Sequence, residues 1–186
     1  MTEGKSLRVD ARRNRDALVA AARGAFDGGS VPARFDDFAA LAGVGVGTLY
    51  RHFPTRESLA TAVYEDEVIA LCDRGRALLT ECPAAEALTT FLRTFTEYVV
   101  AHAALAQALA ALVGPDTDGK AEKHALEQTV ADLLAAGLVD GSIHANATPG
   151  AVMVVLHGIG SSTARADWSS ASIAAVDIFL RGLNAT

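Results

Sequence analysis

Glycines divide the segment from residue 36 to residue 53 into two short apolar patterns, and this division constrains the fold more than any other feature of the chain. The patterns predict a short helix over 36–42, a break over 43–45 and a second short helix over 46–53. Two short helices joined by a tight glycine turn form a helix-turn-helix. The sequence therefore predicts a helical unit built around this turn.

The second helix of the predicted motif is left with polar side chains. Small side chains at Ala39 and Gly43 are expected to let the two helices approach closely, and Ala42 is expected to face inward. The apolar side chains expected to form the small core are Phe38, Leu41, Val44 and Leu49. The polar side chains expected on the outer face are Thr48, Tyr50, Arg51 and His52. These groups suit phosphate oxygens and base edges, so the face is a candidate nucleic-acid surface.

Charge is divided unevenly along the chain. Residues 1–59 carry nine basic and seven acidic side chains, a net charge of +2, whereas residues 60–186 carry seven basic and fifteen acidic side chains, a net charge of −8. A basic end on an acidic body is a hint of polyanion binding. Because the predicted helix-turn-helix lies in the basic part, the charge distribution supports polyanion binding by this part of the chain.

Composition excludes several classes of protein. With 51% hydrophobic and 20% charged residues, the chain is expected to be globular rather than disordered, collagen-like or disulfide-stapled. Apolar stretches such as 151–156 are too short to span a membrane. The N-terminus lacks the apolar core of a signal peptide, and Cys72 and Cys82 are the only cysteines. We therefore expect a cytoplasmic protein.

The remainder of the chain follows the helical period and shows almost no β-branched alternation. Gly28 and Gly29 are expected to end the first helix, and Gly137 is expected to end a later one. The helices expected outside the motif cover about 9–27, 55–80, 83–114 with a break near His102, 121–136, a segment starting at Pro149, and 170–183. The predicted fold class is all-α, with about nine helices. It comprises an N-terminal three-helix helix-turn-helix head over residues 1–54 and a C-terminal helical bundle over residues 55–186.

Two helix starts carry capping signals. Thr55 is expected to cap the fourth helix, with Glu57 in the first turn, where the helix dipole favours a negative charge. Thr148 is expected to cap the helix that begins with Pro149, since proline suits the first helical position.

A family resemblance lies in residues 42–59, which read Ala-Gly-Val-Gly-Val-Gly-Thr-Leu-Tyr-Arg-His-Phe-Pro-Thr-Arg-Glu-Ser-Leu. They resemble the turn, recognition helix and fourth-helix start of the tetracycline-repressor (TetR) family of bacterial transcriptional regulators. The resemblance extends more loosely over 9–65, and over 66–186 it rests on helical character and length. It implies a homodimeric repressor that a small molecule releases from a near-palindromic DNA operator.

The resemblance also implies DNA contacts. It places recognition-helix contacts at Thr48, Tyr50, Arg51 and His52, and a phosphate contact at Arg56. Gly45 and Val46 stand where the family often has a hydroxyl residue and a lysine, which leaves more base reading to Thr48 and Arg51. Arg34 stands where a capping threonine often precedes the second helix. The arginines near the N-terminus are Arg8, Arg12 and Arg13. They either lie on a solvated helix face or, as we expect beside such a motif, contact phosphates or the minor groove.

In this family, helices five to eight enclose an effector pocket. The candidate lining residues are Phe91, Phe95, Tyr98, His102, Met153, His157 and Trp168. A core role is the favoured interpretation for Phe91, Phe95 and Met153. His102 and His157 are as well explained by hydrogen-bonded positions in the core or in a dimer interface.

The last two helices are apolar on more than one face, which suggests a partner subunit. A four-helix interface between two copies is expected to use Val152, Val155, Leu156, Ile159, Ile173, Val176, Leu180 and Leu183.

Two other functions are compatible with the sequence. One is a DNA-binding regulator that acts constitutively or with a protein partner instead of a small effector. The other is an all-helical enzyme using His102 or His157, although residues 158–161 lack the Gly-x-Ser-x-Gly order of a nucleophile elbow. Residues 116–119 lack the later ligands of a calcium loop, and no cysteine or histidine pair has metal-ligand spacing, so no cofactor or metal is expected.

Overall fold

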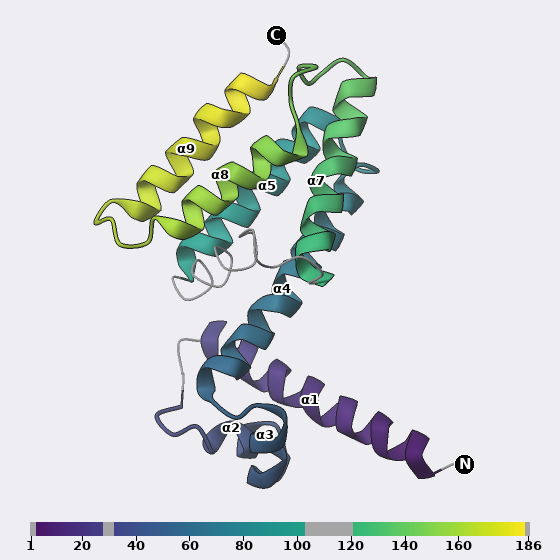
Figure 1. The fold of residues 1–186 in the computed structure, drawn as a ribbon, viewed down its shortest axis with the longest axis vertical. Coiled ribbons are helices and arrows are strands. Elements are labelled where there is room, and N and C mark those ends of the chain that lie inside the picture. The colour runs from purple at the N-terminus through teal and green to yellow at the C-terminus, as the bar shows by residue number, and fades with distance from the viewer. Residues whose placement is uncertain (1–2, 28–31, 103–120, 185–186) are drawn as a thin grey trace. The chain divides into compact units, whose positions relative to one another are not determined.

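The computed structural model describes residues 3–27, 32–102 and 121–184, with side chains described from residue 9 onward except at residue 121. These residues form eight helices and no strand (Figure 1), in agreement with the predicted all-α class and close to the predicted helix count. The helices are α1 (Glu3–Asp27), α2 (Asp37–Leu41), α3 (Val46–His52), α4 (Arg56–Leu78), α5 (Ala84–Ala101), α7 (Ala121–Val139), α8 (Pro149–Ser161) and α9 (Trp168–Leu183).

Two expectations fall outside the described residues, the glycine stop at 28–29 and the part of the 83–114 helix beyond residue 102, and so do residues 116–119. The break near His102 is confirmed, because α5 ends at Ala101. No helix in the described part of the chain is long and apolar enough to cross a membrane.

The chain forms two compact units, Met1–Glu65 and Asp66–Thr186, and it passes from one to the other within α4. The sequence places the end of the DNA-binding domain earlier, at residue 54. That functional division remains a prediction.

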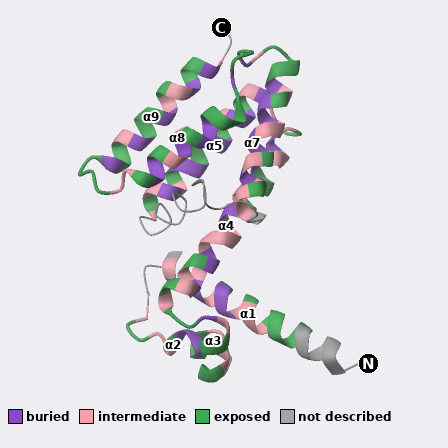
Figure 2. Ribbon diagram, viewed as in Figure 1, coloured by how far each residue is buried: buried purple, intermediate pink, exposed green. Residues whose placement is uncertain are grey.

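The first unit has its own core, to which α1, α2, α3 and the first part of α4 contribute. α1 packs against α2 and α3, and α2 packs against α3. Buried residues appear along the second half of α1 and on α2 (Figure 2). The fully buried side chains at the centre are Leu18, Ala22, Phe38, Leu49 and Leu59. A shared apolar core therefore holds the helix-turn-helix against α1 and α4.

The turn between α2 and α3 differs from its prediction in two respects. Gly43 has a φ of +68°, and a Cβ placed there would meet no atom within 4 Å. Glycine is thus required by the left-handed backbone and not by close helix approach. The second difference is Leu41, which was expected in the core but is 58% exposed. It is the last residue of the five-residue α2, in which only Phe38 and Ala39 are buried.

The start of α4 confirms the predicted cap. The Oγ1 of Thr55 accepts a hydrogen bond from the backbone N–H of Ser58 at 3.1 Å. In return, the Oγ of Ser58 accepts from the backbone N–H of Thr55 at 3.2 Å. Two donors that the helix itself cannot satisfy are thereby paired, in the reciprocal manner of a capping box. The same helix start lowers the pKa of Glu57, mainly through its own backbone N–H and then through Thr55.

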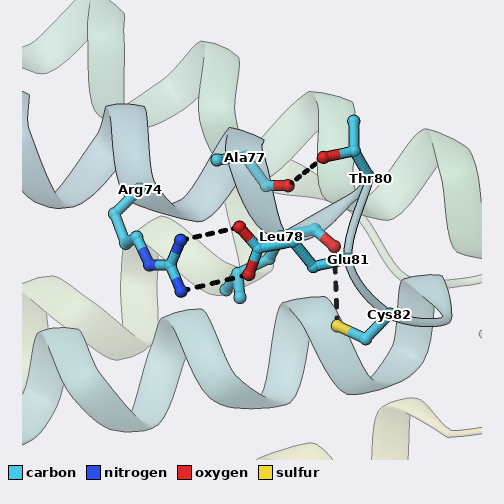
Figure 3. Close-up of polar contacts among 6 residues, drawn as sticks. All are labelled: Arg74, Ala77, Leu78, Thr80, Glu81 and Cys82. Atoms are coloured by element: carbon cyan, nitrogen blue, oxygen red, sulfur yellow. Dashed lines mark hydrogen bonds and ion pairs between the residues drawn. The ribbon is translucent and has the colours of Figure 1, made fainter.

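Side chains of α4 and of the turn that follows form hydrogen bonds at the end of this helix (Figure 3). Arg74 donates two hydrogen bonds to the carboxylate of Glu81, at 2.7 and 3.1 Å. Thr80 donates to the carbonyl of Ala77, and the thiol of Cys82 donates to the carbonyl of Leu78. The last carbonyls of the helix thus find partners before α5 begins.

The second unit is a bundle in which α5 packs against both α7 and α9, while α8 contacts α7 and α9. Buried and exposed positions alternate along α8 and α9 (Figure 2), as expected for helices covered on one side. The centre is formed by fully buried side chains of α5 and α7, notably Leu88, Leu92, Phe95, Leu126, Leu133 and Leu134.

Gly137 does not end α7, contrary to the prediction. The helix continues to Val139, and the chain turns at Gly141, whose φ is +75°. A Cβ at residue 137 would overlap the side chain of Ile143, so this glycine makes room for a residue that folds back onto the helix. The predicted start of α8 is confirmed, since the Oγ1 of Thr148 accepts from the backbone N–H of Ala151 at 3.2 Å.

Candidate nucleic-acid interface

α3 brings the four predicted contact residues together on one seven-residue helix. Its only buried residue is Leu49, which anchors the helix in the core of the first unit. Arg51 and Tyr50 are exposed, the latter to 46%, whereas Thr48 and His52 are half-buried. With a single apolar anchor, α3 presents its other side chains at the surface of the first unit.

Tyr50 is tied to the residue that precedes α2. Its hydroxyl donates a hydrogen bond to the Oδ1 of Asp36 at 2.8 Å, and its ring meets that of Phe35 edge-on, with centroids 5.4 Å apart. Arg34 lies 3.9 Å from the other oxygen of Asp36. The hydrogen bond to Asp36 is the largest of the effects that raise the pKa of Tyr50 above its ordinary value, followed by burial. Tyr50 is therefore a protonated donor at neutral pH.

Arg56 also has partners within the first unit. Its Nη2 donates to the carbonyls of Pro32 and Ala33, at 2.8 and 3.0 Å. The guanidinium carbon lies 5.5 Å from the centre of the Phe38 ring. These contacts use both protons of one terminal nitrogen and leave the other N–H groups of the guanidinium available. The predicted phosphate contact at Arg56 stays a prediction.

The arginines of α1 are described in part. The side chain of Arg8 lies outside the described residues, and Arg12 and Arg13 are exposed. Arg15 is half-buried and lies over the ring of Phe53 at 5.9 Å, which fixes this face of α1 near the end of α3. Whether the exposed arginines reach DNA stays a prediction.

Sequence reasoning assigned no role to Asp36 or Phe35. Both contact a side chain fourteen or more positions along the chain, and helical period carries no signal for such a contact. The only local signal is the position of Asp36 just before α2, which predicts a helix cap. In the structure, Asp36 makes no side-chain cap bond.

The candidate effector residues lie in several places in the second unit. Phe91 lines a hollow of about 210 Å³ between α4 and α5, where the absence of a Cβ at Gly75 makes room for its ring. Trp168 lines a different groove, of about 430 Å³, between α8 and α9. The indole of Trp168 donates to the carbonyl of Ile159 at 2.7 Å and so joins the two helices.

The remaining candidates have structural partners. Phe95 and Met153 are buried, and Phe95 packs against Phe91 with ring centroids 5.9 Å apart. The Nδ1 of His102 lies 2.9 Å from the carbonyl of Tyr98, and the two rings are 4.5 Å apart. The Nε2 of His157 lies 3.3 Å from the Oγ of Ser161. Their role in an effector pocket stays a prediction.

The predicted dimer residues are mostly core residues of their own chain. α5 packs against α9, and α7 packs against α8. Val176 and Leu180 are only 2% and 3% exposed. The others buried in the same way are Val152, Leu156, Ile159 and Leu183, whereas Val155 is half-buried and Ile173 is exposed. Of the four α9 residues expected at an exposed interface, Ile173 is exposed and Val176, Leu180 and Leu183 are buried, so the expectation of exposure is wrong for those three. The apolar side chains that α8 and α9 do expose include Val154 and Ile178.

Comparisons with known proteins cover both units. Residues 17–63 match the family model described as bacterial regulatory proteins of the tetR family, and residues 83–185 match the model of the SbtR-like transcriptional regulator C-terminal domain. A comparison with curated protein sequences finds no match.

Several solved structures have the same fold. A TetR transcriptional regulator from Streptomyces coelicolor is 36% identical, with 92% of this chain and 99% of that one covered and a TM-score of 0.62. A TetR transcription regulatory protein from Mycobacterium vanbaalenii is 31% identical, with 96% and 99% covered and a TM-score of 0.63. FadR from Thermus thermophilus, a repressor solved with lauroyl-CoA, shares the fold at 18% identity, with 90% and 94% covered and a TM-score of 0.56.

Proposed function

Because the chain belongs to the TetR family of transcriptional regulators, we propose that it is a homodimeric repressor whose α3 helices bind a near-palindromic operator. A small molecule bound by the second unit releases it from that operator. In this proposal, residues 1–54 bind DNA, and residues 55–186 bind the effector and dimerise.

The observation that carries the proposal is the surface of α3. A helix with one buried anchor, Leu49, exposes a guanidinium at Arg51 beside the phenol of Tyr50. A guanidinium can pair bidentately with the O6 and N7 atoms of guanine in the major groove. Arg51 is the residue that we assign to base reading, with Thr48 beside it, while His52, Arg56 and the exposed arginines of α1 are assigned to phosphates or the minor groove.

A dimer is proposed because a near-palindromic operator offers two half-sites, one for each recognition helix. Two recognition helices fit successive major grooves when they lie about 34 Å apart, one turn of DNA. Since the buried stripe of α9 is unavailable, we assign the contact between copies to exposed apolar residues of α8 and α9, namely Val154, Ile173 and Ile178, together with the groove between these helices.

A small molecule controls DNA binding if it binds the DNA-free and DNA-bound states of the protein with different affinities. A ligand that binds the DNA-free state more tightly than the DNA-bound state shifts the protein away from the operator, and DNA weakens ligand binding by the same factor. The lauroyl-CoA complex of FadR supports the idea that this fold holds a small ligand, although at 18% identity it does not indicate which ligand suits this chain.

The test is protection of promoter DNA by the purified protein. Promoters of genes adjacent to its own are digested with and without the protein, and each protected site is then challenged with a library of small compounds. We expect a protected near-palindrome and at least one compound that abolishes protection. Protection that no compound relieves would support the alternative, a regulator that is constitutive or controlled by a protein partner. No protected site at all would contradict the proposal.

A further inference from the structure

The recognition helix is held at two neighbouring positions. Leu49 fixes one side of α3 in the core, and Tyr50 fixes the next side through its hydrogen bond to Asp36. Successive residues of an α-helix lie about 100° apart around its axis, so two neighbouring anchors prevent the helix from turning about either one. Arg51, about 200° from Leu49, is thereby directed away from the core.

The Tyr50 hydroxyl has one proton to give. An ionised carboxylate can only accept, so the 2.8 Å contact uses that proton on Asp36. A phosphate oxygen is also only an acceptor and is negatively charged, so it would compete with Asp36 for the same proton and would be repelled by its charge. The Asp36 contact and a phosphate contact from Tyr50 are thus alternatives.

Asp36 is placed for this contact and not for capping. It occupies the N-cap position of α2 but has helical φ and ψ angles and makes no side-chain cap bond. Its second oxygen faces Arg34 at 3.9 Å, and the ring of Phe35 supports that of Tyr50. Three consecutive residues before α2 thus contribute to one connection with α3.

We propose that Asp36 is a positioning residue for DNA recognition: it holds the Tyr50 hydroxyl and sets the orientation of α3, so that Tyr50 acts through Asp36 and not through a phosphate. The proposal rests on the proposed function, since it assigns a role within operator binding. It adds a specificity-determining residue that lies outside the recognition helix.

The experiment is a double-mutant cycle on Asp36→Ala and Tyr50→Phe in the full chain. Affinities are measured for the operator and for random DNA at fixed salt concentration, and the readout is their ratio. Each single substitution should lower the ratio about tenfold, the equilibrium equivalent of one hydrogen bond to a charged group. The double variant should lower it no further, because both substitutions remove the same bond.

Two further variants separate orientation from charge. Asp36→Asn keeps an oxygen that accepts from Tyr50, so it should retain most of the parent ratio. Asp37→Ala removes the same charge from an exposed neighbouring position, and it should raise affinity for both DNAs alike and leave their ratio unchanged.

The outcomes distinguish this proposal from the proposed function. If the parent protects an operator but Asp36→Ala binds it as selectively as the parent, the positioning role is overturned while the proposed function stands. Additive losses in the cycle would likewise assign Tyr50 to a phosphate. If the parent binds no DNA sequence selectively, both proposals fall together.

Discussion

Helices α3 and α9 differ in what they place at the surface. α3 buries one residue, Leu49, and leaves its polar side chains accessible. α9 buries Trp168, Ser172, Val176, Leu180 and Leu183 beneath the rest of its unit. Substitutions on the outer face of α3 should therefore change binding with little effect on folding, whereas substitutions on the buried face of α9 should change folding first.

Leu180→Asp should unfold the second unit. It removes a side chain that is only 3% exposed and introduces an unpaired charge in its place, at a cost of about 4 kcal/mol or more. The measurement is denaturant unfolding followed by fluorescence of Trp168, which is the only tryptophan and is buried in this unit.

The matched variant is Ile178→Asp, two residues away on the same helix and 63% exposed in the parent. It should stay folded and sediment as a monomer if Ile178 lies between two copies, as proposed. A Leu180→Asp protein with parental stability would contradict the assignment of α9 to the core.

Gly137→Val should destabilise the second unit by about 1 to 3 kcal/mol, because the added atoms need the space that Ile143 occupies. Gly150→Ala is the control, since a Cβ at residue 150 would meet no atom within 4 Å. The two midpoints of unfolding are compared in the same denaturant. Equal midpoints would mean that Ile143 moves aside freely.

Substitutions at Arg56 test the first unit, and their expected effect on stability is the smallest. Arg56→Ala should cost about 1 kcal/mol of stability, because it loses the bonds to the carbonyls of Pro32 and Ala33. Arg56→Lys is the matched variant, because its ammonium keeps the charge and remains a hydrogen-bond donor. If Arg56 also contacts a phosphate, the alanine variant alone should lower the slope of log affinity against log salt, by about one for each half-site. An alanine variant as stable as the parent would show that the carbonyl contacts contribute nothing.

The same contrast explains which features the sequence predicts well. The helix-turn-helix follows from local signals, because its left-handed turn requires the glycine at residue 43 and its apolar residues recur at helical spacing on either side of that turn. Caps at Thr55 and Thr148 are equally local. Helical period shows which face of a helix is apolar, but it does not show what covers that face.

Contacts made only in the folded chain, which helical period does not show, account for the misassigned residues. α9 is covered by α5, and Arg93 pairs with Asp177 across 84 positions of sequence at 2.8 Å. Gly137 looked like a helix stop because only the folded chain brings Ile143 against it. Asp36 was missed for the same reason, since its partner Tyr50 lies on another helix. Predicting such contacts requires the tertiary arrangement.

In the proposed function, α3 reads DNA sequence through Arg51. The most direct measurement compares the affinity of the parent and of Arg51→Ala for the protected operator, for operators changed at one base pair per half-site, and for random DNA. We predict a loss of about 1 to 3 kcal/mol on the operator, relaxed preference at one position in each half-site, and little change on random DNA. Equal weakening on the operator and on random DNA would contradict the claim and make Arg51 a phosphate contact.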